Sequence, residues 1–256
     1  MKIAENVEML ELAWQAGAAL YPVLVWDDKD AVLIDTGFPE QFDLLRAEVE
    51  KTGLSLERIT KIILTHQDMD HIGNAKLLRE LGAKRTVVPA GGGGETLAHK
   101  GVQVLAHEKE APYIQGDEPS PKLLKMEARM KEHPQEVSPE ERAMYERMKT
   151  VAPSLWLPVD QTLKDGEVLP CCGGIEVVYT PGHTPGHISL LLRSANVLVT
   201  GDAANGFGGV LTGPNPKHTL DMVAAQRSFE RLRALNPKLV VCYHGGLCHN
   251  GGASRS

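Results

Sequence analysis

The sequence lacks long apolar runs, an excess of basic residues and an export-type N-terminus. No apolar run approaches the roughly 20 residues that a membrane-spanning helix needs. Acidic residues interrupt the opening MKIAENVEMLELAW, where a signal peptide would have a continuous apolar segment. Acidic side chains outnumber basic ones by 33 to 27, giving a formal net charge of −6, whereas nucleic-acid-binding surfaces are usually basic. These absences predict a cytoplasmic protein that has neither a membrane nor a nucleic acid as its partner.

The chain also lacks a cysteine zinc motif and a recognisable serine nucleophile. Its cysteines, Cys171, Cys172, Cys242 and Cys248, fit no CxxC spacing, so we expect reduced thiols. No serine stands in the GxSxG context that marks the nucleophile of α/β-hydrolases. Any hydrolytic chemistry must therefore be carried by other residue types.

Two parts of the chain repeat one pattern. Each has a pair of strand-like segments ending at an aspartate, Asp35 or Asp202, then a helix-like segment, and then a short apolar strand ending at a histidine, His66 or His244. Two similar halves suggest two sheets packed face to face. The pattern therefore predicts an α+β fold, a four-layer αββα sandwich of two mixed sheets with helices outside.

The helices of the two halves have clear sequence signals. In the first half Pro39 stands where a first turn would begin, and apolar residues recur at helical spacing over 42–49. In the second half Thr219 can cap a helix that ends before Pro237.

The middle of the chain departs from this pattern. Residues 84–101 include the Gly-rich stretch VVPAGGGGETLAHKG, which is typical of a loop, and residues 118–150 are charged, Met-rich and interrupted by proline. We expect a single domain over residues 1–256 with a loop and helical insertion at about 84–150. Two interpretations stay open: the insertion forms a lid, as long insertions in compact domains often do, or it is a solvated helical excursion without a role in chemistry.

The segment from Thr65 to Gly73, THQDMDHIG, is the most informative in the chain. Two histidines and two aspartates that could bind a metal fall within six residues directly after an apolar strand. Imidazole and carboxylate groups both bind zinc, manganese and iron. Packing alone explains such a cluster poorly, because burying these groups without partners is costly. The segment therefore predicts a metal site.

With its downstream motifs, this segment resembles the metallo-β-lactamase superfamily. That family has a strand followed by THxHxDHxG, then a glycine-flanked histidine, an aspartate and a last histidine. This chain has TPGHTPGH at 180–187, TGDA at 200–203 and CYHGG at 242–246, and LIDTG at 33–37 resembles the family's upstream aspartate turn. The motifs occur in the family's order and cover nearly the whole chain except its middle.

The resemblance implies a binuclear centre. Carried over by position, the implied ligands are His66, Asp68 and His183 for the first metal, Asp70, His71 and His244 for the second, and Asp202 as the bridge. Asp70 is also expected to help deliver a proton. Asp35 is expected to orient a ligand histidine by hydrogen bonding rather than to bind metal, and His187 to lie outside the coordination sphere.

Asp68 departs from the family's commonest pattern, which has a second histidine at this position. An anionic oxygen in place of a neutral nitrogen makes the first site harder. We expect two divalent metal ions, zinc before manganese or iron. The alternative is that Asp68 turns away and leaves the first site weak or empty.

The resemblance implies an enzyme. In the leading hypothesis, a metal-bridging hydroxide cleaves a small-molecule lactone, ester, thioester or amide, and Tyr113 and Tyr145 are candidates for the substrate pocket of a monomer or homodimer. The alternative is an iron-dependent redox enzyme, an oxygenase or a sulfur-handling enzyme, because di-iron members of the superfamily carry a carboxylate where Asp68 stands. A non-catalytic binding module is disfavoured, because such members usually lose ligands.

Overall fold

Along the strands, successive buried side chains point to opposite faces of the sheet. The two sheets pack face to face around an apolar interior. In β6 (Ala31–Ile34), Val32 and Ile34 belong to the cluster between the sheets, whereas Leu33 belongs to the cluster under the helices. This follows from strand geometry, in which successive side chains point to opposite faces. The computed structural model of the protein describes residues 1–15, 17–83 and 101–249.

The first sheet has seven strands, in the order β1-β2-β5-β6-β7-β8-β9. It is mixed, because β5 and β6 pair antiparallel whereas β6 to β9 run parallel. Its other strands are β1 (Lys2–Ala4), β2 (Val7–Met9), β5 (Val23–Trp26), β7 (Lys61–Leu64), β8 (Gln103–His107) and β9 (Gln161–Leu163).

The second sheet has six strands, in the order β10-β11-β12-β13-β16-β17, and only its β13–β16 pair is parallel. Its strands are β10 (Val168–Leu169), β11 (Ile175–Tyr179), β12 (Ile188–Leu192), β13 (Val197–Val199), β16 (Leu239–Cys242) and β17 (Gly246–Cys248). Two small hairpins lie beside the sheets: β3 (Leu12–Gln15) with β4 (Ala18–Leu20), and β14 (Asn205–Phe207) with β15 (Val210–Thr212).

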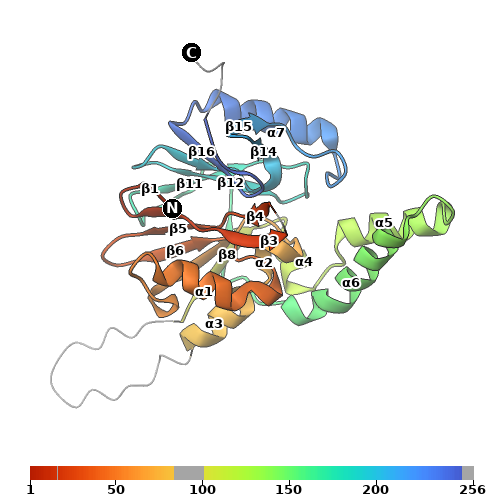
Figure 1. Cartoon of the computed structure of the whole chain (residues 1–256), viewed down its shortest axis with the longest axis horizontal. Helices are drawn as coiled ribbons and strands as arrows, with labels where there is room; N and C mark the ends of the chain where they lie inside the picture. The colour runs from red at the N-terminus through yellow and green to blue at the C-terminus, as the bar shows by residue number, and fades with distance from the viewer. Residues whose placement is uncertain (16, 84–100, 250–256) are drawn as a thin grey trace.

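Helices cover the outer face of each sheet, as Figure 1 shows. Leu45 and Leu78 pack with Leu33 on the seven-stranded sheet, and Leu232 packs with Val240 on the six-stranded sheet. Fully burying one such side chain contributes about 1.5–3 kcal/mol. The predicted α+β fold, a four-layer αββα sandwich, is confirmed. The covering helices are α1 (Phe42–Glu50), α3 (Ala75–Ala83) and α7 (Met222–Ala234).

The repeated pattern of the sequence is present in three dimensions. The hairpin β5–β6, α1 and β7 form one copy, and the hairpin β12–β13, α7 and β16 form the other. The first helical segment begins at Pro39 as a 3-10 turn, η1 (Pro39–Gln41). The cap predicted for the second was wrong: Asp221 accepts hydrogen bonds from Val223 N and Ala224 N, whereas Thr219 Oγ1 donates to a preceding carbonyl.

The middle of the chain contributes more to the core than its sequence indicates. β8 (Gln103–His107) lies between β7 and β9 in the first sheet, and α4 (Ala111–Gln115) follows it. The range predicted for the insertion, 84–150, contains this central strand. The Gly-rich stretch at 84–100 lies outside the described residues.

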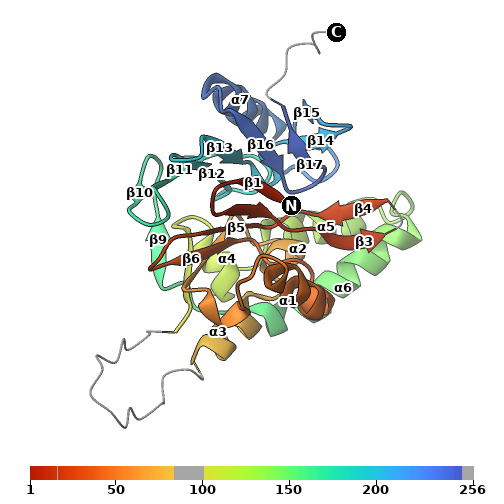
Figure 2. The ribbon, with the colours of Figure 1, turned by 60° about the vertical axis from the view of Figure 1, so that its left-hand side comes forward.

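The true excursion is a helical hairpin of α5 (Pro121–Glu132) and α6 (Pro139–Leu155). It extends from the end of the sandwich where α2 lies, as both ribbon views show (Figure 1 and Figure 2). None of the side chains of α5 is buried, whereas α6 buries Tyr145 and Leu155. Within the described ranges no helix has the length and apolar character to cross a bilayer.

Candidate metal centre

The candidate ligands come from strand ends of both sheets. His66 comes two residues after β7 ends, Asp202 three residues after β13 ends and His244 two residues after β16 ends, while Asp35, which directly follows β6, lies beside them. The pairs β6–β7 and β13–β16 are parallel, so the carboxyl ends of each pair lie at one edge. The facing sheets bring the two edges together at one end of the sandwich.

A tight turn places the rest of the THQDMDHIG motif. After Asp68 the chain enters α2 (Met69–Ile72), one turn that carries Asp70 and His71. Thr36 fixes this turn, because its Oγ1 donates to His71 O at 2.8 Å. Gly73 is required by close packing, because a Cβ there would lie 2.4 Å from Gly37 O in the loop after β6.

Four side chains form the first group that could hold a metal: His66, Asp68, His183 and Asp202. Asp68 Oδ2 lies 3.2 Å from His66 Nε2 and 3.1 Å from His183 Nε2. Asp202 Oδ2 lies 3.2 Å from His183 Nε2. Asp68 therefore turns into the group.

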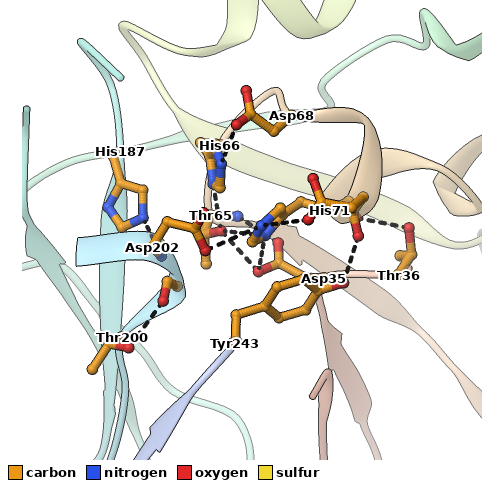
Figure 3. Close-up of polar contacts among 12 residues, drawn as sticks. Asp35, Thr36, Thr65, His66, Asp68, His71, His187, Thr200, Asp202 and Tyr243 are labelled. Carbon is orange, nitrogen blue, oxygen red and sulfur yellow. Dashed lines mark hydrogen bonds and ion pairs between the residues drawn. The ribbon is translucent and has the colours of Figure 1, made fainter. Parts of the chain in front are cut away.

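Asp70, His71 and His244 form the second group. Asp70 Oδ2 lies 3.3 Å from His244 Nε2. The other oxygen of Asp202, Oδ1, lies 3.3 Å from His71 Nε2 and 3.4 Å from His244 Nε2. The Asp202 carboxylate thus presents one oxygen to each group, and Figure 3 shows it between His66 and His71.

Buried polar atoms at the centre support cation binding. His66 Nε2, His71 Nε2 and Asp202 Oδ1 are buried and make no hydrogen bond within the described residues. An unsatisfied buried polar group costs about 1–3 kcal/mol. A bound cation would satisfy all three atoms at once, and imidazole nitrogen with carboxylate oxygen is a donor set for zinc, manganese or iron. The residues present therefore fit the metal centre that their motifs imply.

Comparison with known proteins decides the family. Residues 21–244 match the sequence profile described as the Metallo-beta-lactamase superfamily. The chain belongs to this superfamily. The match includes all seven side chains of the two groups.

Individual members of the superfamily support the assignment. Probable metallo-hydrolase YflN of Bacillus subtilis is 29% identical over 228 residues, which cover 84% of this chain and 75% of the relative. Hydroxyacylglutathione hydrolase GloC of Haemophilus influenzae is 24% identical over 254 residues, covering 98% and 96%. The crystal structure of a metallo-beta-lactamase family protein from Thermus thermophilus shares the fold, with a TM-score of 0.69 and 22% identity over 97% of this chain and 76% of the other. Together, the relatives and the clustered ligands support a metal-dependent hydrolase.

Asp35 and Tyr243 orient the second group. Asp35 accepts hydrogen bonds from Thr65 N at 2.9 Å and from Thr65 Oγ1 at 2.8 Å, and its Oδ2 lies 2.9 Å from His71 Nδ1 (Figure 3). This contact leaves His71 Nε2 facing the centre, as metal-binding histidines require. The Tyr243 ring packs against His71 with centroids 3.9 Å apart and planes tilted by 32°, and its hydroxyl donates to Asp70 O. The sequence analysis predicted the role of Asp35 but missed Tyr243.

Both ring nitrogens of His187 are taken up by hydrogen-bonding contacts. Its Nε2 accepts from Asp202 N at 2.9 Å, and its Nδ1 lies 2.9 Å from Thr180 Oγ1. His187 therefore holds the backbone of Asp202, and its place outside the coordination sphere stays a prediction.

Glu110 is a buried carboxylate that the sequence analysis missed. Its Oε1 accepts from Gln67 N at 3.0 Å and its Oε2 accepts from Gly186 N at 2.8 Å. The side chain thereby ties the turn after His66 to the turn before His187. Burial raises the pKa of Glu110 to about 7. In sequence this residue is one of two glutamates in HEKEA, and only burial sets it apart.

Lys122 of α5 is a second residue that the sequence did not indicate. Its Nζ forms an ion pair with Asp68 Oδ2 and lies 2.7 Å from His183 Nε2. The Lys122 side chain is only partly exposed, at 12%. The helical excursion thus delivers a positive charge into the first group.

The buried charges shift one another's pKa values. Burial lowers the pKa of His66 to about 4, and the charge of His71 adds to this. Burial also lowers the pKa of His71, but the carboxylates of Asp35, Asp70 and Asp202 outweigh it and raise that pKa well above its usual value. For Asp202 burial raises the pKa, but the neighbouring imidazoles hold it well below its usual range. The Asp202 carboxylate is therefore ionised, and metal binding at His71 would release a proton.

The tyrosines and cysteines lie outside the two groups. Tyr145 is buried on α6, with Lys149 Nζ 5.6 Å from its ring centroid, and Tyr113 is half-buried on α4. Their place in a substrate pocket stays a prediction. All four cysteines are buried and unbridged.

Proposed function

We propose that the chain is a binuclear hydrolase that uses two divalent ions, zinc before manganese or iron, to cleave a small-molecule lactone, ester, thioester or amide. The observation that carries this proposal is the Asp202 carboxylate, with Oδ2 3.2 Å from His183 Nε2 and Oδ1 3.3 Å from His71 Nε2. A carboxylate that faces two groups of ligands is suited to bridging two cations.

The bound ions would supply hydroxide at neutral pH and a positive charge for the oxygen of the scissile carbonyl. The chain's own residues position the substrate and move protons. Asp70 is the proposed proton carrier, because its Oδ2 lies 3.3 Å from His244 Nε2 and 17% of its side chain is exposed. It can therefore exchange a proton with a leaving group that enters from solvent.

The substrate class is supported by the relatives and by the surface near the centre. GloC is named as a hydroxyacylglutathione hydrolase, which favours the thioester among the four candidates. The α5–α6 hairpin is proposed as a lid, because Lys122 reaches the first group from α5. Tyr113 remains the better pocket candidate, since Tyr145 is buried.

We also propose that the enzyme acts in the cytoplasm, as a monomer or homodimer. Four buried, unbridged cysteines suit a reducing compartment.

Elemental analysis and a substrate panel test the proposal. Protein purified without chelator should carry close to two equivalents of transition metal and should hydrolyse at least one substrate among lactones, thioesters and carboxylic esters. Phosphodiesters serve as the comparison class, because they carry no carbonyl. Metal-free protein that keeps full activity would contradict the proposal. Iron with a visible absorption band and no hydrolysis would favour the redox alternative.

A further inference from the structure

Lys122 and a metal ion would occupy the same place in the first group. The ammonium contacts Asp68 Oδ2 and lies 2.7 Å from His183 Nε2. A metal would bind these same atoms at about 2.0–2.2 Å. The lone pair of His183 Nε2 can accept from an ammonium or bind a metal, but not both. The two cations therefore exclude each other.

Among the residues that the structure describes, no lysine or arginine contacts the second group. Its nearest charges are the carboxylates of Asp35 and Asp202, at 2.9 Å and 3.3 Å from the nitrogens of His71. Both favour a cation. The two groups should therefore differ in affinity even though each contains imidazole and carboxylate donors.

Lys122 is also the main polar attachment of α5 to the sandwich. No side chain of α5 is buried. The other ion pairs described for this helix stay within the hairpin: Arg129 pairs with Glu141, and Lys131 pairs with Glu127. α6, in contrast, is anchored by Arg147, which pairs with Glu40. Release of Lys122 would free the first turn of α5 and leave α6 in place.

We propose that Lys122 is an internal competitor for the first metal, so that loading of this site and release of α5 are coupled. The inference rests on the proposed binuclear centre. The second metal binds first and tightly. The first metal binds more weakly, because it must displace Lys122, and its arrival opens the excursion at the edge where substrate would enter.

Metal titration of three proteins tests the competition. Metal-free wild type, Lys122→Met and Lys125→Met are titrated with Zn²⁺ against a chromophoric chelator. Lys125 is the matched control, because it is exposed on the same helix and its replacement removes the same charge. In Lys122→Met the weaker step should tighten by roughly 10- to 100-fold, the effect expected of a charge-assisted hydrogen bond. The tighter step and the Lys125→Met variant should match wild type.

Hydrogen exchange supplies a readout that does not depend on activity. In wild type, amides of α5 should exchange faster once the weaker site is filled. In Lys122→Met they should exchange fast before zinc is added, and Lys122→Gln should behave in the same way.

The outcomes separate this inference from the proposed function. Identical weaker steps in wild type and Lys122→Met would overturn the competition while leaving the binuclear centre intact. Two zinc ions bound without any change in the exchange of α5 would overturn the coupling. Absence of zinc binding in every variant would overturn the metal centre and the inference together.

Discussion

The two groups of metal ligands are built from similar donors but are supported differently. The second group is held by the core: Asp35 fixes one ring nitrogen of His71, and Tyr243 packs against its ring. In the first group Asp68 lies on a turn and faces Lys122, which comes from an excursion with little buried surface. Similar ligands can thus bind a metal with different affinities, because the residues that contact the ligands differ. Four predictions test this contrast, from the largest expected effect to the smallest.

Removal of the Asp202 carboxylate, which both groups share, should weaken metal binding at both groups and so abolish the difference in affinity between them. Asp202→Asn should reduce hydrolysis by more than about 100-fold, because changes outside the coordination sphere alone often cost 10- to 100-fold. Both metals should weaken, since the amide keeps one oxygen but loses the negative charge that both groups share. Steady-state rates and metal content measure this, with the exposed Asp43→Asn as the control. Loss of only one metal would contradict a bridging role.

Weakening the contact between Asp35 and His71 should lower the metal affinity of the second group alone. Asp35→Asn keeps the size of the side chain but removes the charge beside His71 Nδ1. The tighter zinc step should weaken by about 10- to 100-fold, and the weaker step should not move. Zinc titration with a competing chelator measures both steps. A shift of the weaker step alone would reverse the assignment of the two affinities.

Restoring the family's usual residue should change metal preference in the first group. Asp68→His replaces an anionic oxygen with a softer nitrogen and removes the ion pair with Lys122. Zinc should then be favoured over manganese by a further factor of about 10, as imidazole and carboxylate preferences suggest. Competition binding with the two metals measures the shift. An unchanged preference would mean that Asp68 does not bind metal.

The smallest effect on the two metal sites concerns Glu110, which ties the two ligand turns together. The pKa of Glu110 in the folded protein, about 7, lies above the ordinary value of 4.5. Between pH 4.5 and pH 7 the folded protein therefore binds more protons than the unfolded chain. This contribution to stability is complete below pH 4.5 and is lost as pH rises through 7, amounting to about 3 kcal/mol at most.

Glu110→Gln should remove that pH dependence, because the amide cannot ionise. Chemical denaturation at pH 5 to 8 in the presence of chelator gives the free energy of unfolding of each protein. Wild type should be stabilised relative to the variant most strongly at pH 5. The exposed neighbour Glu108 provides the control, since Glu108→Gln should show a difference that does not vary with pH. A parallel pH profile for wild type and Glu110→Gln would show that Glu110 is ionised throughout.

The sequence by itself determined the layers of the fold and the set of candidate ligands. Short apolar strands must be covered on both faces, and polar ligands placed directly after them must lie at sheet edges. These signals are local, so Asp35, His66 and His244 were readable as parts of one site. β8 was missed because its short apolar stretch adjoins Gly-rich and charged segments that dominate the local pattern.

Only the tertiary structure decided which residues stand behind the ligands. Glu110, Lys122 and Tyr243 carry no distinguishing local pattern, and their roles arise from contacts with residues between 43 and 173 positions away. Their chemistry depends on burial, which takes a carboxylate, an ammonium and a phenol out of water. Each group then depends on its protein partners for hydrogen bonds and for opposite charge. Burial is a property of the assembled sheets and helices, so no segment of the sequence specifies it alone.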